Sequence, residues 1–170
     1  MAIEKVFDYH ILSVTDKAIF VQVVALPETV TTNYFNAFFS AGITPVSFEL
    51  EGQAITRAVL DPADTGSCMI VDFGANRTGI TIVTNKTAMI TATLDFGGKM
   101  LTKTLAKELN ISLEEAEKIK REHGLTTVGE HKDVFSVLAN SISVLKDEIN
   151  RRYLYWYEKK NQLGTFPAID

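Results

Sequence analysis

A short acidic and glycine-containing segment after an apolar run is the feature of this sequence best suited to chemistry. Asp72 and Gly74 follow the apolar residues 69–71. A carboxylate at the end of a buried strand can hold a water molecule or a hydrated Mg²⁺, and a glycine two residues later lets the backbone approach a phosphate closely. Successive amides in such a turn form an anion-binding concavity, to which Thr78 can add a hydroxyl donor. The alternative is a plain hairpin in which Asp72 and Gly74 only shape the turn.

A pair of glycines, Gly97 and Gly98, precedes an expected helix. The free amides and the dipole at the start of a helix favour an anion or a polar ligand group. Both glycine turns end strands of one expected sheet, at the same edge, so the sequence predicts two places of close backbone approach to one ligand. The alternative for Gly97 and Gly98 is a tight connection between a strand and a helix.

Glu117 and Lys120 are three residues apart, so their side chains share a face of a helix. Together they can hold the hydroxyl groups of a ribose. The alternative is an exposed ion pair, a common arrangement worth only about 0.3–0.5 kcal/mol.

Other kinds of catalytic or metal site find little support in the sequence. The three histidines, His10, His123 and His131, are far apart and lack metal-ligand spacing. Cys68 is the single cysteine, which excludes an internal disulfide and a multi-cysteine metal site. It lies beside an apolar run, and we expect it to be a buried structural thiol.

The first part of the chain has the pattern of a small β-β-α-β subdomain. Its expected elements are, in chain order, strands 6–14 and 18–26, helix 28–41, strand 44–50 and helix 53–60. Gly42 is the expected C-terminal stop of the first helix. The turn-forming residues 61–66 mark a boundary, so we expect two subdomains, 1–62 and 67–170.

The second part predicts a sheet followed by helices, and hence a mixed α+β chain of the α/β class. The expected elements are strands 68–73, 78–84 and 87–94 and helices 99–109, 112–123 and 132–159. The continuous apolar run in 68–73 indicates a strand buried on both faces. Ser112 and Glu115 have the spacing of a capping box. One buried stripe is expected on the last helix, formed by Leu138, Ile142, Leu145, Ile149 and Tyr153.

The composition is that of an ordinary globular protein. The chain has 170 residues, of which 46% are hydrophobic and 22% are charged, and its net charge is −4. A nucleic-acid-binding protein needs a clustered basic surface, which is missing. The N-terminus lacks the apolar core of a signal peptide, and the longest apolar stretch, 19–26, is too short to span a membrane. We expect a soluble, cytoplasmic protein that binds no nucleic acid and reaches a membrane only through a partner.

Three segments, in order and at suitable spacing, resemble motifs of the actin-like ATPase superfamily, which includes actin, DnaK-type chaperones and FtsA. They are 69–79 (MIVDFGANRTG), 94–102 (LDFGGKMLT) and 114–120 (EEAEKIK). Within the superfamily the sequence is most similar to the PilM family of type IV pilus assembly. Its small SHS2-like insertion subdomain resembles segments 23–30, 41–46 and 51–58. The resemblance implies a partial actin-like (ribonuclease H-like) ATPase fold.

The resemblance also implies a role for each candidate residue. Asp72 would position Mg²⁺ or a water molecule, Gly74, Ala75 and Asn76 would line the phosphates of ATP, and Gly98 would approach the nucleotide. Glu117 and Lys120 would face the ribose. The implied cofactor-binding set is Asp72, Gly74, Ala75, Asn76, Thr78, Gly97, Gly98, Glu117 and Lys120, with Asp72 as the metal residue.

Members of the PilM family capture the N-terminal cytoplasmic peptide of the membrane protein PilN. The resemblance therefore implies a surface for a PilN-like peptide near residues 18–41, and a location peripheral to the inner membrane. The alternatives are an FtsA-like cell-division protein and a nucleotide-free interaction module. A sugar or acetate kinase of the same fold is disfavoured because no substrate motif is recognisable.

Two features of the family are missing from the sequence. No first Asp-x-Gly phosphate loop precedes Val6, and no adenine-binding Gly-Gly turn follows the last helix. We therefore expect a middle fragment whose half of the nucleotide clamp binds ATP weakly or not at all and hydrolyses none. An unpaired sheet edge left by the missing strands would favour self-association into a homo-oligomer.

Overall fold

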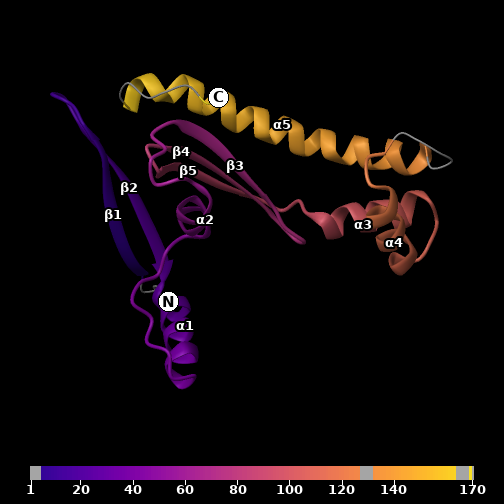
Figure 1. Cartoon of the computed structure of the whole chain (residues 1–170), viewed down its shortest axis with the longest axis horizontal. Coiled ribbons are helices and arrows are strands. Elements are labelled where there is room, and N and C mark those ends of the chain that lie inside the picture. Colours follow the sequence, from indigo (N-terminus) through magenta and orange to yellow (C-terminus); the bar gives the residue numbers. More distant parts are fainter. Residues whose placement is uncertain (1–4, 127–131, 164–168, 170) are drawn as a thin grey trace. The chain divides into compact units, whose positions relative to one another are not determined.

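The structure is a computed structural model that describes residues 5–126, 132–163 and 169. Contacts divide the chain into two compact units, whose elements are labelled in Figure 1. The first unit comprises Met1–Cys68, Val83–Met89 and Lys160–Asp170, and the second comprises Met69–Ile82 and Ile90–Lys159. The predicted mixture of strands and helices is confirmed. The predicted domains 1–62 and 67–170 stay a prediction, because the strands of one sheet contribute to both units.

Two long strands, β1 (Lys5–Val14) and β2 (Ile19–Pro27), form the predicted antiparallel hairpin. Their β-branched and aromatic residues favour extended backbone. Thr15 closes the turn, since its amide and its hydroxyl both donate to the carbonyl oxygen of Ala18, at 2.9 and 3.1 Å. A β-bulge between Ile11 and Ser13 shifts the register near this turn. The shift decides which side chains of β1 share a face with those of β2.

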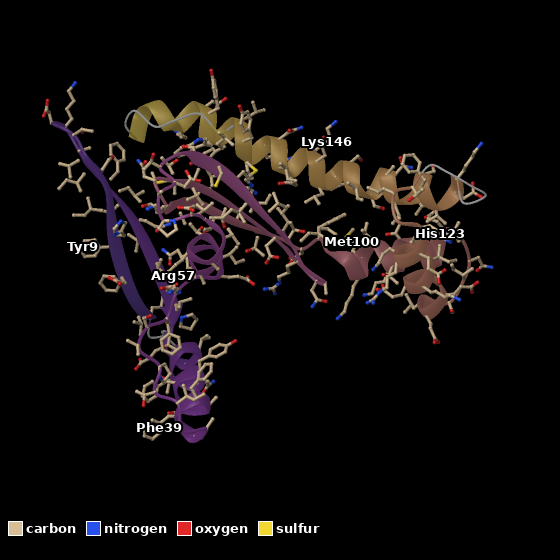
Figure 2. The ribbon with its side chains drawn as sticks, in the orientation of Figure 1. Tyr9, Phe39, Arg57, Met100, His123 and Lys146 are labelled. Carbon is tan, nitrogen blue, oxygen red and sulfur yellow. The ribbon has the colours of Figure 1, made fainter. Side chains whose placement is uncertain are left out.

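Helix α1 (Glu28–Ser40) follows Pro27 and ends where the sequence predicts. Gly42 has a φ of 78°, and the amides of Gly42 and Ile43 donate to the carbonyl oxygens of Phe39 and Phe38 at 3.0 and 2.9 Å. This is a Schellman motif, which satisfies carbonyl groups at the end of a helix. No residue of α1 is buried, and Phe39 projects from its last turn (Figure 2).

The predicted strand 44–50 is wrong. Residues 43–50 form neither helix nor strand, and the described hairpin has only two strands. Val46 is 99% exposed, so its side chain has no neighbour to pack against. Strand preference depends mainly on such cross-strand and same-face neighbours. In the described residues the first subdomain is therefore β-β-α, followed by helix α2 (Glu51–Val59).

Strands β3 (Ser67–Phe73), β4 (Thr78–Thr84) and β5 (Thr87–Leu94) form a sheet in the order β3-β4-β5. The strand buried on both faces is β4, not β3 as predicted. Six of the seven residues of β4 are buried, whereas Val71 and Phe73 of β3 are 40% and 44% exposed. The central strand has neighbours on both sides, while β3 is at the edge of the sheet. The position of each strand in the sheet, central for β4 and at the edge for β3, therefore explains how deeply its side chains are buried.

Three helices follow the sheet: α3 (Gly98–Glu108), α4 (Leu113–His123) and α5 (Lys132–Leu163). Asn110 follows α3 with a φ of 52°, a conformation that asparagine tolerates. The hydroxyl of Ser112 accepts a hydrogen bond of 3.1 Å from the amide of Glu115, which is one half of the predicted capping box. No helix in the described part of the chain is long and apolar enough to cross a membrane.

These helices enclose a hydrophobic core in the second unit. The buried members of this core are Phe96, Leu101, Leu105, Ala116, Val134, Leu138 and Leu145. The predicted stripe of α5 is confirmed in its first four positions, with Ile142 and Ile149 partly buried against the core. Tyr153 is exposed and is wrongly included in the stripe. The core fixes α3 and α4 against each other, and these helices carry part of the candidate site.

Candidate functional site

The two glycine turns predicted from the sequence lie against each other in the second unit. The amide of Gly98 donates a hydrogen bond of 3.0 Å to the carbonyl oxygen of Gly74. The amide of Lys99 donates one of 2.8 Å to the carbonyl oxygen of Ala75. The prediction that the turn after β3 and the turn before α3 come together is confirmed.

Gly97 makes this contact possible. A Cβ atom at this position would lie 2.7 Å from the carbonyl oxygen of Gly74 and 2.8 Å from that of Ala75. Both atoms belong to the backbone and cannot move aside like the end of a flexible side chain. A Cβ atom at Gly98 would have Lys120 Nζ as its nearest neighbour, at 3.6 Å, which is an ordinary contact distance. The close approach of the two turns therefore requires a glycine at position 97 but not at position 98.

The amides at the start of α3 are not free, contrary to the expectation from the sequence. Those of Gly98 and Lys99 donate to the turn after β3, and that of Met100 donates to the carbonyl oxygen of Gly97 at 2.9 Å. The first amides of a helix lack partners within the helix and must find them elsewhere. Here a second protein turn takes the place that the prediction gave to an anion.

The turn after β3 has free amides of its own. The amides of Ala75 and Asn76 have no hydrogen-bond partner among the described residues. Both residues are exposed, and the turn is closed by a hydrogen bond of 2.9 Å from the amide of Gly74 to the carbonyl oxygen of Arg77. Two successive free amides can bind an anion together.

Asp72 lies near this turn, at the end of β3. It is half-buried, and it makes no hydrogen bond or ion pair with any residue that the structure describes. Gly79 on the neighbouring strand leaves space beside it, since a Cβ atom there would lie 3.7 Å from Asp72 Cβ. The described residues contain no group of three acidic, histidine or cysteine side chains that could hold a metal. Asp72 can therefore offer one carboxylate to a cation that keeps most of its water ligands.

Thr78 does not fit its predicted role. Its side chain is fully buried, and its hydroxyl donates a hydrogen bond of 2.6 Å to the carbonyl oxygen of Phe96. This bond satisfies the carbonyl group of a buried residue in the connection between β5 and α3. The hydroxyl is therefore structural, and we remove Thr78 from the candidate ligand-binding residues.

Glu117 and Lys120 form an ion pair of 2.6 Å that also reaches α3. Lys120 Nζ donates to Thr102 Oγ1 at 2.8 Å and to the carbonyl oxygen of Gly98 at 3.0 Å. Thr102 Oγ1 donates to Glu117 Oε2 at 2.5 Å. The Lys120 side chain is only 17% exposed, so the alternative of a plain exposed ion pair does not describe it. With three acceptors for its three hydrogens, Lys120 braces α4 against the start of α3.

These contacts keep Glu117 ionised. The hydrogen bond from Lys120 is the main cause that lowers the pKa of Glu117 to about 2, and those from Thr102 and Arg121 contribute further. Arg121 Nε lies 2.7 Å from Glu117 Oε1. Hydrogen bonds to the charged form of a carboxyl group favour that form. By contrast, partial burial and the nearby Asp64 raise the pKa of Cys68, which disfavours a reactive thiolate.

Thr102 and Arg121 belong to this cluster but were not predicted. Thr102 lies one helical turn after Gly98, and its hydroxyl also approaches the carbonyl oxygen of Gly98 at 3.0 Å. Arg121 lies four residues after Glu117, a spacing typical of helical ion pairs. That spacing could have indicated Arg121. Thr102 becomes recognisable only when the packing of α3 on α4 is known.

Comparisons with known proteins identify a family and several relatives to which this chain is similar. The family model described as cell division protein FtsA matches residues 69–155, a range that contains all the candidate site residues. The ethanolamine utilization protein EutJ of Escherichia coli (strain K12) is 36% identical over 86 residues, covering 51% of this chain and 31% of that protein.

Two solved structures share the fold. The PilM-PilN type IV pilus biogenesis complex matches with a TM-score of 0.70 and 20% identity, covering 94% of this chain and 47% of that chain. MreB5 of Spiroplasma citri bound to ADP matches with a TM-score of 0.60 and 16% identity, covering 74% and 47%. The chain thus spans about a third of the curated relative and about half of each solved chain. The predicted actin-like fold, in part, is confirmed.

Proposed function

This chain belongs to the family of the cell division protein FtsA, and from that we propose that it carries part of an actin-like nucleotide site in an assembly scaffold. The observation that carries the proposal is the contact of Gly97 with the turn at Gly74 and Ala75. This contact brings the predicted phosphate-facing residues of the two glycine turns close together. The assembly we favour is that of type IV pili or a related secretion system.

The residues at this place suit a nucleotide with Mg²⁺. Ala75 and Asn76 offer two adjacent free amides to phosphate oxygens, and Asp72 offers a carboxylate without a protein partner. A bound Mg²⁺ would neutralise phosphate charge, with Asp72 holding one of its water ligands. MreB5, which has the same fold, was solved with ADP. The start of α3 and Thr78 take no part, because their donors already have protein acceptors.

Glu117 and Lys120 have different roles in this proposal. Glu117 stays ionised, and of its roughly four acceptor sites three are used by Lys120, Thr102 and Arg121, which leaves one for a hydroxyl group of a ribose. The ammonium group of Lys120 donates its three hydrogen bonds to Glu117, Thr102 and Gly98. We therefore assign ribose binding to Glu117, and to Lys120 the task of holding the site in shape.

An NMR titration with Mg-ATP tests the nucleotide site. Amide signals of residues 72–76 should shift, and Asp72→Asn should weaken the Mg²⁺-dependent part of the binding by roughly tenfold, as for loss of one charge-assisted contact. The control is Asp95→Asn, since Asp95 is an exposed carboxylate that lies 3.6 Å from Arg77. Equal binding by both variants, or shifts confined to other residues, would contradict the assignment.

We further propose that a PilN-like cytoplasmic peptide of a membrane protein occupies the groove between the hairpin and α1. This groove has a volume of about 440 Å³, and its walls include Val24 and Leu26 of β2 and Thr32 and Phe35 of α1. Its walls from β2 and α1 belong to the surface 18–41 expected from the sequence, while Val6, Phe7, Asp8 and Phe48 also line it. The PilM of similar fold was solved in a complex with PilN.

A matched pair of variants tests the peptide groove. Phe35→Lys should weaken binding of such a peptide by about tenfold or more, because it puts a charge into an apolar contact. Tyr34→Lys is the control, since Tyr34 is an exposed neighbour that does not line the groove. Equal losses in calorimetry would place the peptide elsewhere.

A role in cell division is the second candidate, and the match to the FtsA family model favours it. The two candidates differ in their partner. If no PilN-like peptide binds and the chain instead sediments with division filaments, the division role is the correct one.

A further inference from the structure

One face of the β1–β2 hairpin is apolar from Phe7 to the turn, and Lys5, paired with Pro27, lies at its far end. It consists of four cross-strand pairs: Phe7 with Ala25, Tyr9 with Val23, Ile11 with Val21 and Val14 with Ile19. We call these eight residues the hairpin face. The seven larger ones are 45–70% exposed, and Ala25 is exposed too. Figure 2 shows Tyr9 projecting from the hairpin.

The β-bulge keeps this face apolar up to the turn. Strict alternation after Ile11 would put Ser13 on the hairpin face. Instead, the register shift pairs Ser13 with Phe20 and Val14 with Ile19, and Ile19 shares its face with Val21 because strand side chains alternate. The opposite face carries polar side chains, among them Asp8, His10 and Gln22. The two faces of the hairpin therefore have different chemistry.

The size of the hairpin face exceeds what a monomer normally exposes. Taking about 150–250 Å² for a fully exposed aromatic residue, and values near the lower end of that range for valine and isoleucine, the exposed members offer on the order of 800 Å². The largest apolar patch of a typical monomer is about 300–600 Å². A two-stranded hairpin is also at best marginally stable in water without a layer packed on it.

We propose that the hairpin face is the surface through which two copies of this chain associate. None of its eight residues is charged, and Lys5 lies beyond them at the end away from the turn, so these eight residues on two copies meet without electrostatic repulsion. Pairing the face with itself would bury roughly 1,600 Å², the area of a standard stable interface. The two hairpins would pack as two sheets face to face, in the symmetric arrangement that is commonest among dimers.

This surface differs from the proposed peptide groove. The groove side chains Val24 and Leu26 alternate along β2 with Val23 and Ala25 of the hairpin face, and the two surfaces share only Phe7, at the end of the hairpin face away from the turn. The rest of the groove is separate from the hairpin face, and Tyr9 and Val23, the positions that test the association, do not line the groove. Failure of one proposal leaves the other standing.

Sedimentation of the full chain over a concentration series tests the proposal. The wild type should shift from monomer to dimer as the concentration rises. Val23→Lys and Tyr9→Lys, near the middle of the face, should weaken the association by at least about tenfold. Val46→Lys is the control, because Val46 is fully exposed outside the hairpin, and it should associate like the wild type.

Circular dichroism shows whether each variant keeps its fold, and hydrogen exchange of the wild type gives a second measurement. Slower exchange in β1 and β2 at high concentration supports the proposal even if a variant unfolds. A wild type that stays monomeric, or a dimer unaffected by both lysine substitutions, overturns it. Protection of the hairpin face only when a PilN-like peptide is added also overturns it, and identifies the peptide as the occupant.

Discussion

Lys120 of α4 donates a hydrogen bond of 3.0 Å to the carbonyl oxygen of Gly98, twenty-two residues earlier, in the first turn of α3. The same ammonium group holds Glu117 at 2.6 Å. The ion pair therefore links the second glycine turn to α4. A change in the charge of Glu117 should therefore alter the stability of the first turn of α3.

The stability of this region should depend on pH below the usual range of glutamate. The pKa of Glu117 is lowered from 4.5 to about 2 in the folded chain. Its contribution to stability is therefore complete above pH 4.5 and is lost as the pH falls towards 2. Glu117→Gln should remove this acid-dependent loss, as measured by thermal unfolding over a pH series. Glu122→Gln, an exposed glutamate on the same helix, should keep it, and identical profiles for both variants would contradict the prediction.

The adjacent glycines before α3 should differ sharply in their tolerance of alanine. Gly97→Ala should lower the free energy of unfolding by about 1–3 kcal/mol, because the new methyl group would overlap two backbone oxygens. Gly98→Ala should change it by about 0.5 kcal/mol or less, since its nearest neighbour is the end of a lysine side chain. Urea denaturation measures both. Equal effects would show that the two turns do not touch as described.

Features set by a few neighbouring residues were predictable from the sequence. Gly42, Asn110 and Gly124 follow three of the helices, and all have positive φ, because glycine and asparagine tolerate that conformation best. The cap at Ser112 likewise depends on residues only three positions apart. The meeting of the turns at Gly74 and Gly98 was predictable too, since both follow strands of one sheet.

Features that depend on distant neighbours were not predictable in the same way. The amides of α3 looked free because their acceptors, the carbonyl oxygens of Gly74 and Ala75, are more than twenty residues earlier. Thr78 looked available because its acceptor, the carbonyl oxygen of Phe96, is eighteen residues later, between β5 and α3. Segment 44–50 has strand-like residues, but it has no strand beside it in the described structure. In each case the missing information is which groups meet in space.

The buried hydroxyl of Thr78 should contribute to stability rather than to ligand binding. Thr78→Val keeps the shape of the side chain but leaves the carbonyl oxygen of Phe96 without its 2.6 Å donor. The free energy of unfolding should fall by about 1–3 kcal/mol, the cost of an unsatisfied buried acceptor. Thr93→Val, on the exposed part of β5, should change it little. If chemical denaturation finds Thr78→Val as stable as the wild type while Mg-ATP affinity falls, the hydroxyl has the ligand-binding role after all.

Gln22 should hold the hairpin to its neighbours in the first unit. Its Nε2 donates to the carbonyl oxygen of Ala88 in β5 at 2.7 Å, and its Oε1 accepts from Gln53 Nε2 of α2 at 3.2 Å. Gln22→Met fills a similar volume but leaves both partners unsatisfied, so hydrogen exchange in β1 and β2 should accelerate by about tenfold, since such a loss costs about 1–3 kcal/mol. Gln22→Glu keeps the acceptor for Gln53 and loses only the donor to Ala88, so its effect at neutral pH separates the two bonds. Exchange in the hairpin that is unchanged by Gln22→Met would show that packing, and not this polar bridge, holds β2 in place.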